Sequence, residues 1–361
     1  MTHTCLAAVT RQPDRTPTVE MIELREPRTG EVLVRTRSAG ICGTDLHFAA
    51  GTFPYPMPTV LGHEASGVVE AIGDGVNWVK PGDRVIVCDQ TFCGRCADCV
   101  SGRMVYCTDT QAKQRQRDRL LIDGGPRRQY LGVSAFAELM LVDENSLIAV
   151  PHGLSDDAAA LLACCITTGA ATIFNVARPR PGAAVAVFGC GGVGLGAIQA
   201  AKAAGASTIV AIDAEQHRLA VAKELGATHV VDAGIDDPVE VVRTSTGIGM
   251  DIAIEAVGLA ITAAQAFSVL APGGQAVVLG MLPPEAEIVL PGRAIRQGRS
   301  IGGSVMGNVR TREDIPRFIN LVQTGSLSAD RLATAHYPLA AIGQALADAR
   351  SRRGVRTMIR F

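Results

Sequence analysis

The chain has 361 residues, of which 47% are hydrophobic and 19% charged, and its formal net charge is −1 at pH 7. This composition excludes a disordered chain and argues against a nucleic-acid-binding surface, which needs clustered positive charge. No apolar run reaches the roughly 18–20 residues of a membrane helix, and the first residues lack a secretory-signal pattern. Ten cysteines without such a signal indicate a reducing compartment. We therefore expect a cytoplasmic protein of two domains, with no membrane or nucleic-acid partner.

The first part of the chain predicts β structure. Runs of strand-forming residues at 31–36, 65–70 and 84–87 are separated by Gly, Pro and Asp turns. Many short strands of this kind favour a barrel-like or sandwich body.

Two segments of this β-rich part, 40–47 and 62–67, carry polar side chains that packing explains poorly. A catalytic zinc takes three protein ligands and keeps one open position, and a Cys, His and Cys set suits an alcohol or carbonyl site. Cys42 and His63 are candidate ligands, and a third would come from farther along the chain.

A four-cysteine pattern follows, in which Cys93, Cys96, Cys99 and Cys107 have the spacing C-x2-C-x2-C-x7-C. Four thiolates this close in sequence suit one tetrahedral zinc ion. A disulfide framework is the alternative, but such frameworks belong to small secreted chains. Because four sulfur ligands leave no open position, we expect this zinc to be structural and the reaction to occur elsewhere.

From about residue 156 the pattern changes to strands that alternate with helices, which favours a parallel, doubly wound sheet. An alanine-rich stretch at 158–171 predicts a helix, and the tail predicts a helix near 312–323 and a strand near 354–361. The sheet's strands are expected at 185–188, 208–212, 251–254 and 276–279, with helices near 197–204, 216–225 and 238–244.

A dinucleotide-binding turn follows the first of these strands. Residues 189–194 read Gly-Cys-Gly-Gly-Val-Gly, a G-x-G-x-x-G between a strand and a helix. Its glycines permit a tight turn and close approach to a pyrophosphate at the helix N-terminus. Asp213 would bind the ribose hydroxyls and repel a 2′-phosphate, which favours NAD over NADP. A helix N-cap is the alternative role for Asp213, and Arg218 nearby would tolerate a phosphate.

Together and in this order, the motifs resemble those of the zinc-dependent medium-chain alcohol dehydrogenase family over essentially the whole chain. The matching segments are Cys42–His47, Gly62–Glu64, the four-cysteine pattern, Ala163–Gly169 and Gly189–Gly194. The resemblance implies an α/β fold with a β-rich GroES-like catalytic domain plus a Rossmann domain with a doubly wound parallel sheet. The catalytic domain would span 1–165, with a structural-zinc lobe at about 88–110, the NAD-binding domain 166–305, and a return to the catalytic domain 306–361.

The resemblance also implies the rest of the metal site. The third ligand would be Cys164, in the family's C-x-x-x-T-G segment, and not Cys165. Without the resemblance, a cysteine in an alanine-rich helix is more often a small buried hydrophobe. Asp45 would accept the other ring N–H of His63, and Glu64 would tune the metal's field or ligate it transiently. A pair of surface acids is the alternative for Asp45 and Glu64.

A proton relay and cofactor contacts follow from the same resemblance. Thr44 would take the alcohol's proton and pass it through the nicotinamide ribose to His47, whereas a turn hydroxyl and a solvent-facing histidine are the alternatives. Arg356 matches a family arginine near the pyrophosphate and would compensate for Gly43, where some relatives carry a basic residue. The implied cofactor-binding residues are Gly189, Gly191, Gly192, Val193, Gly194, Asp213, Arg218, Thr168 and Arg356.

By the same resemblance the substrate pocket involves Phe53, Asp89, Leu131, Val305 and Met306. Phe53 and Met306 favour an apolar alcohol, whereas Asp89 stands where relatives often carry an aromatic residue. We expect reversible hydride transfer between NAD and a primary, allylic or aromatic alcohol. A thiol-adduct formaldehyde dehydrogenase is an alternative that stays open, although the charge that such relatives carry near Phe53 is absent.

Two other functions stay open. One is an NAD(P)H-dependent reductase of aldehydes, imines or alkenes with an altered or idle catalytic zinc, and the other is a nucleotide-binding redox sensor whose output is the cysteine lobe. The long segment 108–130 resembles, slightly shortened, the lobe of the family's dimeric branch. We therefore expect a homodimer with one catalytic and one structural zinc per chain, acting on a small alcohol or aldehyde.

Overall fold

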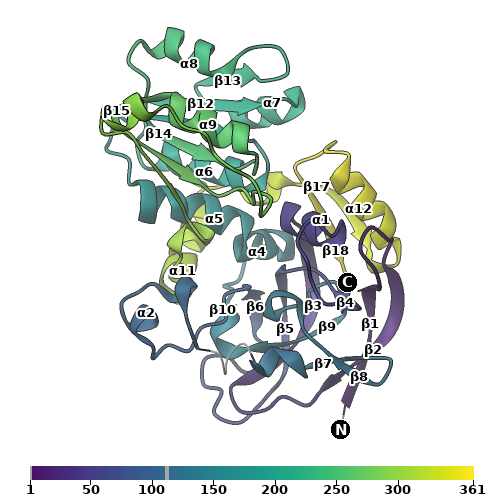
Figure 1. Cartoon of the computed structure of the whole chain (residues 1–361). Coiled ribbons are helices and arrows are strands. Elements are labelled where there is room, and N and C mark those ends of the chain that lie inside the picture. Colours follow the sequence, from purple (N-terminus) through teal and green to yellow (C-terminus); the bar gives the residue numbers. More distant parts are fainter. Residues whose placement is uncertain (1, 110–113) are drawn as a thin grey trace. The chain divides into compact units, whose positions relative to one another are not determined.

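The computed structural model describes residues 2–109 and 114–361, and the chain divides into two compact units (Figure 1). Unit 1 comprises Met1–Cys164, Arg310–Ile319 and Ala329–Phe361, and unit 2 comprises Cys165–Val309 and Asn320–Ser328. Residues 306–309 and 320–328 thus group with unit 2, whereas the sequence placed them in the segment that returns to the catalytic domain.

Unit 1 is β-rich and contains two sheets. A five-stranded sheet has the order β4-β1-β2-β7-β8, and a seven-stranded sheet has the order β10-β6-β5-β3-β18-β17, with β9 paired to β3. Among the described strands of this unit, only β17 and β18 pair in parallel. The strands are β1 (Thr2–Thr10), β2 (Thr18–Arg25), β3 (Glu31–Ile41), β4 (Thr59–Val60), β5 (Glu64–Ile72), β6 (Arg84–Val87), β7 (Leu120–Ile122), β8 (Gly125–Arg127), β9 (Leu139–Asp143), β10 (Leu147–Ala149), β17 (Ala333–Pro338) and β18 (Arg356–Arg360).

The core of unit 1 surrounds β3, which forms hydrogen bonds with β5, β9 and β18. Val32, Leu33 and Val34 are fully buried, because the strand has neighbours on both edges and packed residues on both faces. At its start the fully buried Glu31 forms ion pairs with Arg25 and Arg119. A strand held this firmly fixes the position of the residue that follows it, Cys42.

The alanine-rich stretch is not one helix. α4 (Asp156–Ala163) begins at an N-cap, Ser155, whose hydroxyl accepts a hydrogen bond from the Ala158 N–H. It ends at Cys164, whose φ of −139° and ψ of −73° are not helical, and α5 (Cys165–Ala171) follows. The prediction of a continuous helix over 158–171 was therefore wrong, and neither Gly nor Pro marks the break.

Unit 2 is built on a six-stranded parallel sheet with the order β13-β12-β11-β14-β15-β16. This is the strand order of a doubly wound dinucleotide-binding sheet. The strands are β11 (Ala184–Phe188), β12 (Thr208–Asp213), β13 (His229–Asp232), β14 (Met250–Glu255), β15 (Leu270–Val278) and β16 (Ser300–Gly303). The predicted fold class, a β-rich domain plus a parallel-sheet domain, is confirmed, although β13 and β16 were not predicted.

Helices connect these strands, and both units also contain short helical turns. The remaining helices are α1 (Gly43–Ala49), α2 (Ala97–Val100), α6 (Gly192–Ala203), α7 (Gln216–Leu225), α8 (Pro238–Thr246), α9 (Ala260–Ser268), α10 (Gly292–Ile295), α11 (Thr311–Gln323) and α12 (Ile342–Arg350). η5 (Thr172–Ala177) is a six-residue π-helix, and the short turns are η1 (Met104–Tyr106), η2 (Arg115–Arg117), η3 (Tyr130–Gly132), η4 (Glu144–Ser146), η6 (Met306–Asn308), η7 (Asp330–Leu332) and η8 (Leu339–Ala341).

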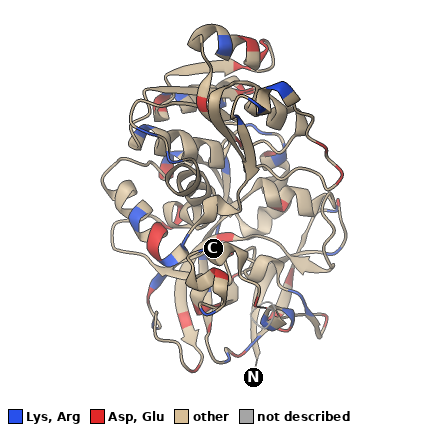
Figure 2. Cartoon of the chain, turned by 60° about the vertical axis from the view of Figure 1, so that its left-hand side comes forward, with Lys and Arg blue, Asp and Glu red and all other residues tan. Residues whose placement is uncertain are grey.

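Acidic and basic residues are interspersed along both units (Figure 2). Within the described ranges, no single helix is long and apolar enough to cross a membrane. One bent pair, Asp156–Ala163 with Cys165–Ala177, meets the length and composition criteria only when its two parts are counted together.

Candidate metal centres and cofactor turn

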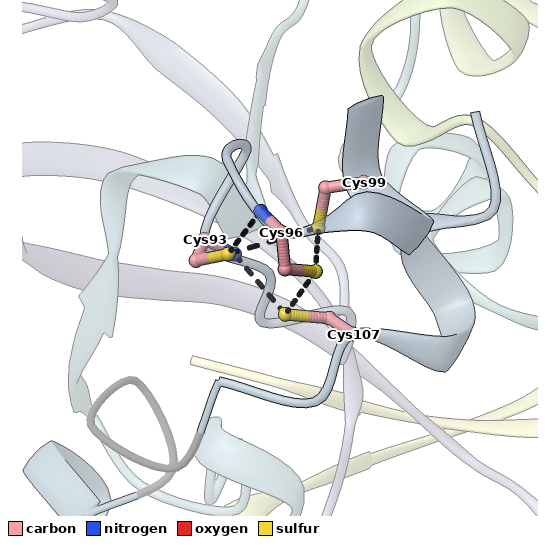
Figure 3. Close-up of side chains that lie close together, drawn as sticks. All are labelled: Cys93, Cys96, Cys99 and Cys107. Atoms are coloured by element: carbon pink, nitrogen blue, oxygen red, sulfur yellow. Dashed lines mark hydrogen bonds between the residues drawn. The ribbon is translucent and has the colours of Figure 1, made fainter. Parts of the chain in front are cut away.

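The four sulfur atoms of Cys93, Cys96, Cys99 and Cys107 lie within 4.8 Å of one another (Figure 3). The Cys96–Cys99 pair is 3.4 Å apart, and Cys96–Cys107 and Cys93–Cys99 are each 3.9 Å apart. Sulfur atoms about 2.3 Å from one tetrahedral zinc ion would lie about 3.8 Å apart, so the donor set fits zinc. None of these cysteines forms a disulfide.

The backbone supports thiolate charge in this lobe. The N–H groups of Cys93 and Cys96 donate to the sulfur atoms of Cys107 and Cys93, at 3.4 and 3.3 Å. Backbone N–H groups of Cys99 and Thr108 lower the pKa of Cys96 to about 6. Hydrogen bonds of this kind stabilise the charged form of a metal ligand.

A second group of donors, Cys42, His63 and Cys164, also lies within 4.8 Å, and all three are buried. Each donor occupies the end of an element: Cys42 follows β3 and precedes α1, His63 precedes β5, and Cys164 is the break after α4. All three belong to unit 1. Three donors leave one position of a tetrahedron open, which is the arrangement of a catalytic zinc site.

Asp45 fixes the ring of His63. Its Oδ1 lies 2.9 Å from His63 Nδ1, while its two oxygens also accept hydrogen bonds from the backbone N–H groups of Cys42 and Gly62, at 2.8 and 3.3 Å. The carboxyl is completely buried. With Nδ1 donating its proton to Asp45, Nε2 is the nitrogen left to face a metal. The alternative of a surface acid is therefore wrong for Asp45.

The two thiols of this group are electrostatically linked. A hydrogen bond from Cys164 lowers the pKa of Cys42 well below its usual value, and the same bond raises the pKa of Cys164. One thiolate is therefore already favoured, and a cation at this position would favour the second.

Glu64 and Arg356 form a buried ion pair beside these donors. Arg356 Nε lies 3.1 Å from Glu64 Oε1, and its other nitrogens reach the Ile41 carbonyl at 3.1 Å and Cys42 Sγ at 3.8 Å. Burial raises the pKa of Glu64 to about 8, although Arg356 opposes the shift. Glu64 is thus not a surface acid, and Arg356, predicted to face the pyrophosphate, has its partners inside unit 1.

Thr44 and His47 lie on α1. Thr44 Oγ1 is 3.7 Å from Cys42 Sγ, and His47, in the last turn, packs edge-on against Phe53 with ring centroids 5.8 Å apart. Residues three apart on a helix share a face. His47 is half-buried, so it is neither fully solvent-facing nor enclosed.

The sequence missed Tyr130, whose completely buried ring lies 6.1 Å from that of His63. Its hydroxyl has no hydrogen-bond partner among the described residues. Leu131, predicted to line the substrate pocket, follows it with a φ of +48°. Nothing local signals this placement, because Tyr130 is held by its edge-on contacts with the Phe48 and Tyr55 rings.

Of the other predicted pocket residues, Asp89 follows β6 in unit 1, whereas Val305 and Met306 belong to unit 2. Val305 is 46% exposed, and Met306 has a φ of +47°. The contribution of these residues to a substrate pocket stays a prediction.

The glycine turn of unit 2 runs from β11 into α6. Gly189 has a φ of +91°, which disfavours other residues, and a side chain at Gly194 would collide with the Gly189 carbonyl. Gly191 is the N-cap of α6, followed by Gly192 and Val193 in its first turn. The turn therefore brings backbone N–H groups to the helix N-terminus, where a pyrophosphate fits.

Asp213 ends β12 and closes on this turn. Its carboxylate accepts hydrogen bonds from the N–H groups of Cys190 at 2.6 Å and Glu215 at 2.9 Å. It is not the N-cap of α7, which is Glu215, while the half-buried Arg218 lies in that helix's first turn. On α5, the Thr168 hydroxyl is nearly buried and has no hydrogen-bond partner among the described residues, so it has capacity for a ligand.

Comparisons with known proteins agree with this architecture. Residues 28–152 match the alcohol dehydrogenase GroES-like domain, and residues 192–324 match the zinc-binding dehydrogenase domain. The chain therefore belongs to the zinc-binding medium-chain alcohol dehydrogenase family, which confirms the family predicted from the sequence. It is an oxidoreductase of that family.

Three solved structures resemble the whole chain. An alcohol dehydrogenase zinc-binding domain protein from Burkholderia ambifaria is 35% identical, with a TM-score of 0.95 and 100% of both chains covered. Benzyl alcohol dehydrogenase from Acinetobacter calcoaceticus is 31% identical, with a TM-score of 0.92 and 99% of both chains covered. A putative zinc-binding dehydrogenase from Sinorhizobium meliloti 1021, bound to NADP, is 27% identical, with a TM-score of 0.84 over 99% of this chain and 100% of the other.

Proposed function

We propose that this protein is a zinc-dependent alcohol dehydrogenase that transfers hydride reversibly between an alcohol and NAD. The observation that supports it most directly is the buried set of Cys42, His63 and Cys164, one donor short of a tetrahedron. The 31% identical benzyl alcohol dehydrogenase supports a primary, aromatic or allylic alcohol as substrate.

In this proposal Cys42, Cys164 and His63 Nε2 would hold a catalytic zinc ion. When bound, the ion would supply a Lewis acid that lowers the pKa of an alcohol at its open position. Asp45 keeps the His63 ring in the required tautomer. Glu64, whose Oε1 lies 3.1 Å from Arg356 Nε, adds a carboxyl group beside the donors, and burial favours the protonated form of that group.

Thr44 and His47 would carry the substrate's proton. The Thr44 hydroxyl stands next to the metal donors, so it is placed to accept a proton from the substrate hydroxyl. His47 lies farther along the same helix and remains partly accessible. An imidazole can accept that proton and release it to solvent.

NAD is proposed as the cofactor over NADP, and a second, structural zinc is proposed in the four-cysteine lobe. The support for NAD is Asp213, whose carboxylate is held beside the glycine turn by two backbone N–H groups. A fixed carboxylate at this position binds ribose hydroxyls and repels a 2′-phosphate. The Sinorhizobium meliloti relative is bound to NADP, so turnover with NAD should be compared directly with turnover with NADP.

A homodimer is proposed as well. β16 is the last strand of the unit 2 sheet and pairs only with β15 within the described part of the chain. Val289 and Ile295, in the segment before it, are 80% and 54% exposed. An open strand edge beside exposed aliphatic residues favours association with a second copy, and the molar mass in solution would test it.

The test is oxidation of a panel of benzylic, allylic and short aliphatic alcohols with NAD or NADP, together with a zinc count. We expect turnover of at least one class, a kcat/KM for NAD at least about 10-fold above that for NADP, and two zinc ions per chain. Reduction of carbonyl or alkene substrates by a one-zinc protein would instead establish a reductase. Nucleotide binding without turnover of any alcohol or aldehyde would favour a redox sensor.

A further inference from the structure

One carboxylate beside the three-donor site, that of Asp89, has no role in the proposed zinc binding or proton transfer. Asp89 lies two residues beyond the end of β6, which pairs antiparallel with β5 so that Val87 faces Ala65. His63 lies two residues before Ala65 on the opposite strand. Continuing the antiparallel register therefore brings Asp89 alongside His63.

The electrostatic environment of Asp89 agrees with this placement. The charges of His63 and Cys42 act on Asp89, and its own charge acts on Cys164 and Tyr130. Asp89 thus stands near every donor of the site. It is not a member of the donor set, because the atoms that lie within 4.8 Å of one another come only from Cys42, His63 and Cys164.

The three acids around this site differ in their partners. Asp45 binds His63 and two backbone N–H groups, and Glu64 has Arg356. Apart from its own backbone, the described residues offer the Asp89 carboxylate only the Cys88 thiol, at 3.9 Å. A thiol is a weak donor, so most of the hydrogen-bonding capacity of Asp89 is unused.

Asp89 is also reachable and charged. It is half-buried, whereas Cys88 before it is completely buried. An aspartate carboxyl is ordinarily ionised at neutral pH. An ionised acceptor in partly desolvated surroundings gains most from a donor that a ligand supplies.

We propose that Asp89 selects substrates that carry a second hydrogen-bond donor, a hydroxyl or an ammonium group, on the carbon next to the reacting alcohol. Asp89 lies alongside His63, a proposed ligand of the zinc ion that would bind the reacting hydroxyl. The second hydrogen-bonding group of the substrate must therefore be close to that hydroxyl. The substrate class is therefore a vicinal diol or a 1,2-amino alcohol, and a monofunctional alcohol leaves the carboxylate without a partner. This inference rests on the proposed alcohol dehydrogenase function and names its substrate.

The test compares alcohols that share one carbon skeleton: 2-phenylethanol, 1-phenyl-1,2-ethanediol and 2-amino-2-phenylethanol. The zinc-loaded wild type is measured with NAD beside Asp89→Asn, Asp89→Leu and Glu70→Gln. Glu70 is an exposed acid of β5, paired with Arg35, and serves as the charge-removal control. Zinc content is measured for every variant.

We expect the wild type to prefer the diol or the amino alcohol over 2-phenylethanol in kcat/KM. That ratio should fall about 10–100-fold in Asp89→Leu, as for the loss of a charged hydrogen bond, and stay constant in Glu70→Gln. Asp89→Asn separates the two donors: the amide oxygen still accepts from a hydroxyl, but the charge that attracts an ammonium group is gone. Loss of the amino-alcohol preference alone would identify the ammonium as the partner.

Unchanged ratios in both Asp89 variants would overturn the assignment while leaving the dehydrogenase function intact. A fall in zinc content would overturn it too, by showing that Asp89 holds the metal. A binding measurement tests the proposal even if none of the three alcohols is oxidised. The diol or amino alcohol should raise the Tm of the zinc-loaded wild type and not that of Asp89→Leu. Equal Tm shifts with 2-phenylethanol would contradict the proposal independently of the reaction.

Discussion

The two candidate metal centres of unit 1 are built in opposite ways. The four-cysteine lobe takes all its donors from residues 93–107, around a four-residue helix, and its apolar support is a small cluster of Phe92, Cys99 and Cys107. The three-donor site takes Cys42, His63 and Cys164 from three separate elements that surround the main core. We therefore expect the lobe to depend on a bound metal for order, and the fold to arrange the three-donor site in advance.

The largest expected effect comes from removing the donor at the helix break. Cys164→Ala should lower turnover on the order of 1,000-fold or more, because a lost Lewis acid removes several kcal/mol of transition-state stabilisation. Zinc content should fall from two ions to one, with the lobe still loaded. The matched control is Cys165→Ala, which removes the same atoms from the neighbouring buried residue outside the donor group. Substantial turnover by Cys164→Ala would remove Cys164 from the ligand set.

Removing a lobe donor should have a different signature. Cys107→Ser should lose the lobe's zinc and increase the rate of proteolysis within residues 88–109 about 10-fold or more, because the apolar cluster of this segment is small. Turnover should fall much less than in Cys164→Ala. Arg95→Ala, an exposed change in the same lobe, is the control. A lobe that resists protease without metal would contradict the idea that the metal orders it.

Asp45→Asn tests whether the three-donor site is arranged in advance. The amide is neutral and has one acceptor oxygen in place of two, so it binds the His63 N–H and the backbone N–H groups less well. Zinc affinity or kcat should therefore fall about 10–100-fold. The exposed Asp74→Asn serves as the comparison. If zinc affinity and kcat both match those of the wild type, the buried carboxylate does not position His63.

The sequence predicts these two centres to different extents, for the same structural reason. The four cysteines lie in one short segment, so their spacing alone indicates a common metal. Cys42 and His63 stand in local motifs, but Cys164 lies in an alanine-rich stretch whose pattern predicts an unbroken helix. Only the resemblance to a family drew attention to it, because the break depends on tertiary packing and on no Gly or Pro.

Other features were missed because they depend on distant contacts. Tyr130 begins the short turn η3, and its ring lies near that of His63 while it packs against Phe48 and Tyr55. The strand β13 has two exposed residues among four, and β16 reads Ser-Ile-Gly-Gly, so neither shows a strand pattern. These segments become strands because they form hydrogen bonds with the neighbouring strands β12 and β15. Local β propensity does not describe such pairing.

The smallest expected effect concerns the strand that positions Cys42. Burial would raise the pKa of Glu31, at the start of β3, but hydrogen bonds from Arg25 and Arg119 outweigh it and hold the pKa at about 2, against an ordinary value of 4.5. A depressed pKa stabilises the folded state above pH 4.5, and this stabilisation is lost as the pH falls towards 2.

The free energy of unfolding should therefore be lower at pH 3 than at pH 7 by about 2 kcal/mol through Glu31 alone. Glu31→Gln should flatten this part of the stability curve, measured by denaturant unfolding of the metal-free protein between pH 3 and 6, since protons displace zinc from its ligands at low pH. If the wild type and Glu31→Gln show the same slope, Glu31 does not anchor β3 by its charge. The geometry of the three-donor site would then depend on the apolar packing of β3 alone. The two centres would differ only in the size of the apolar core that supports each of them.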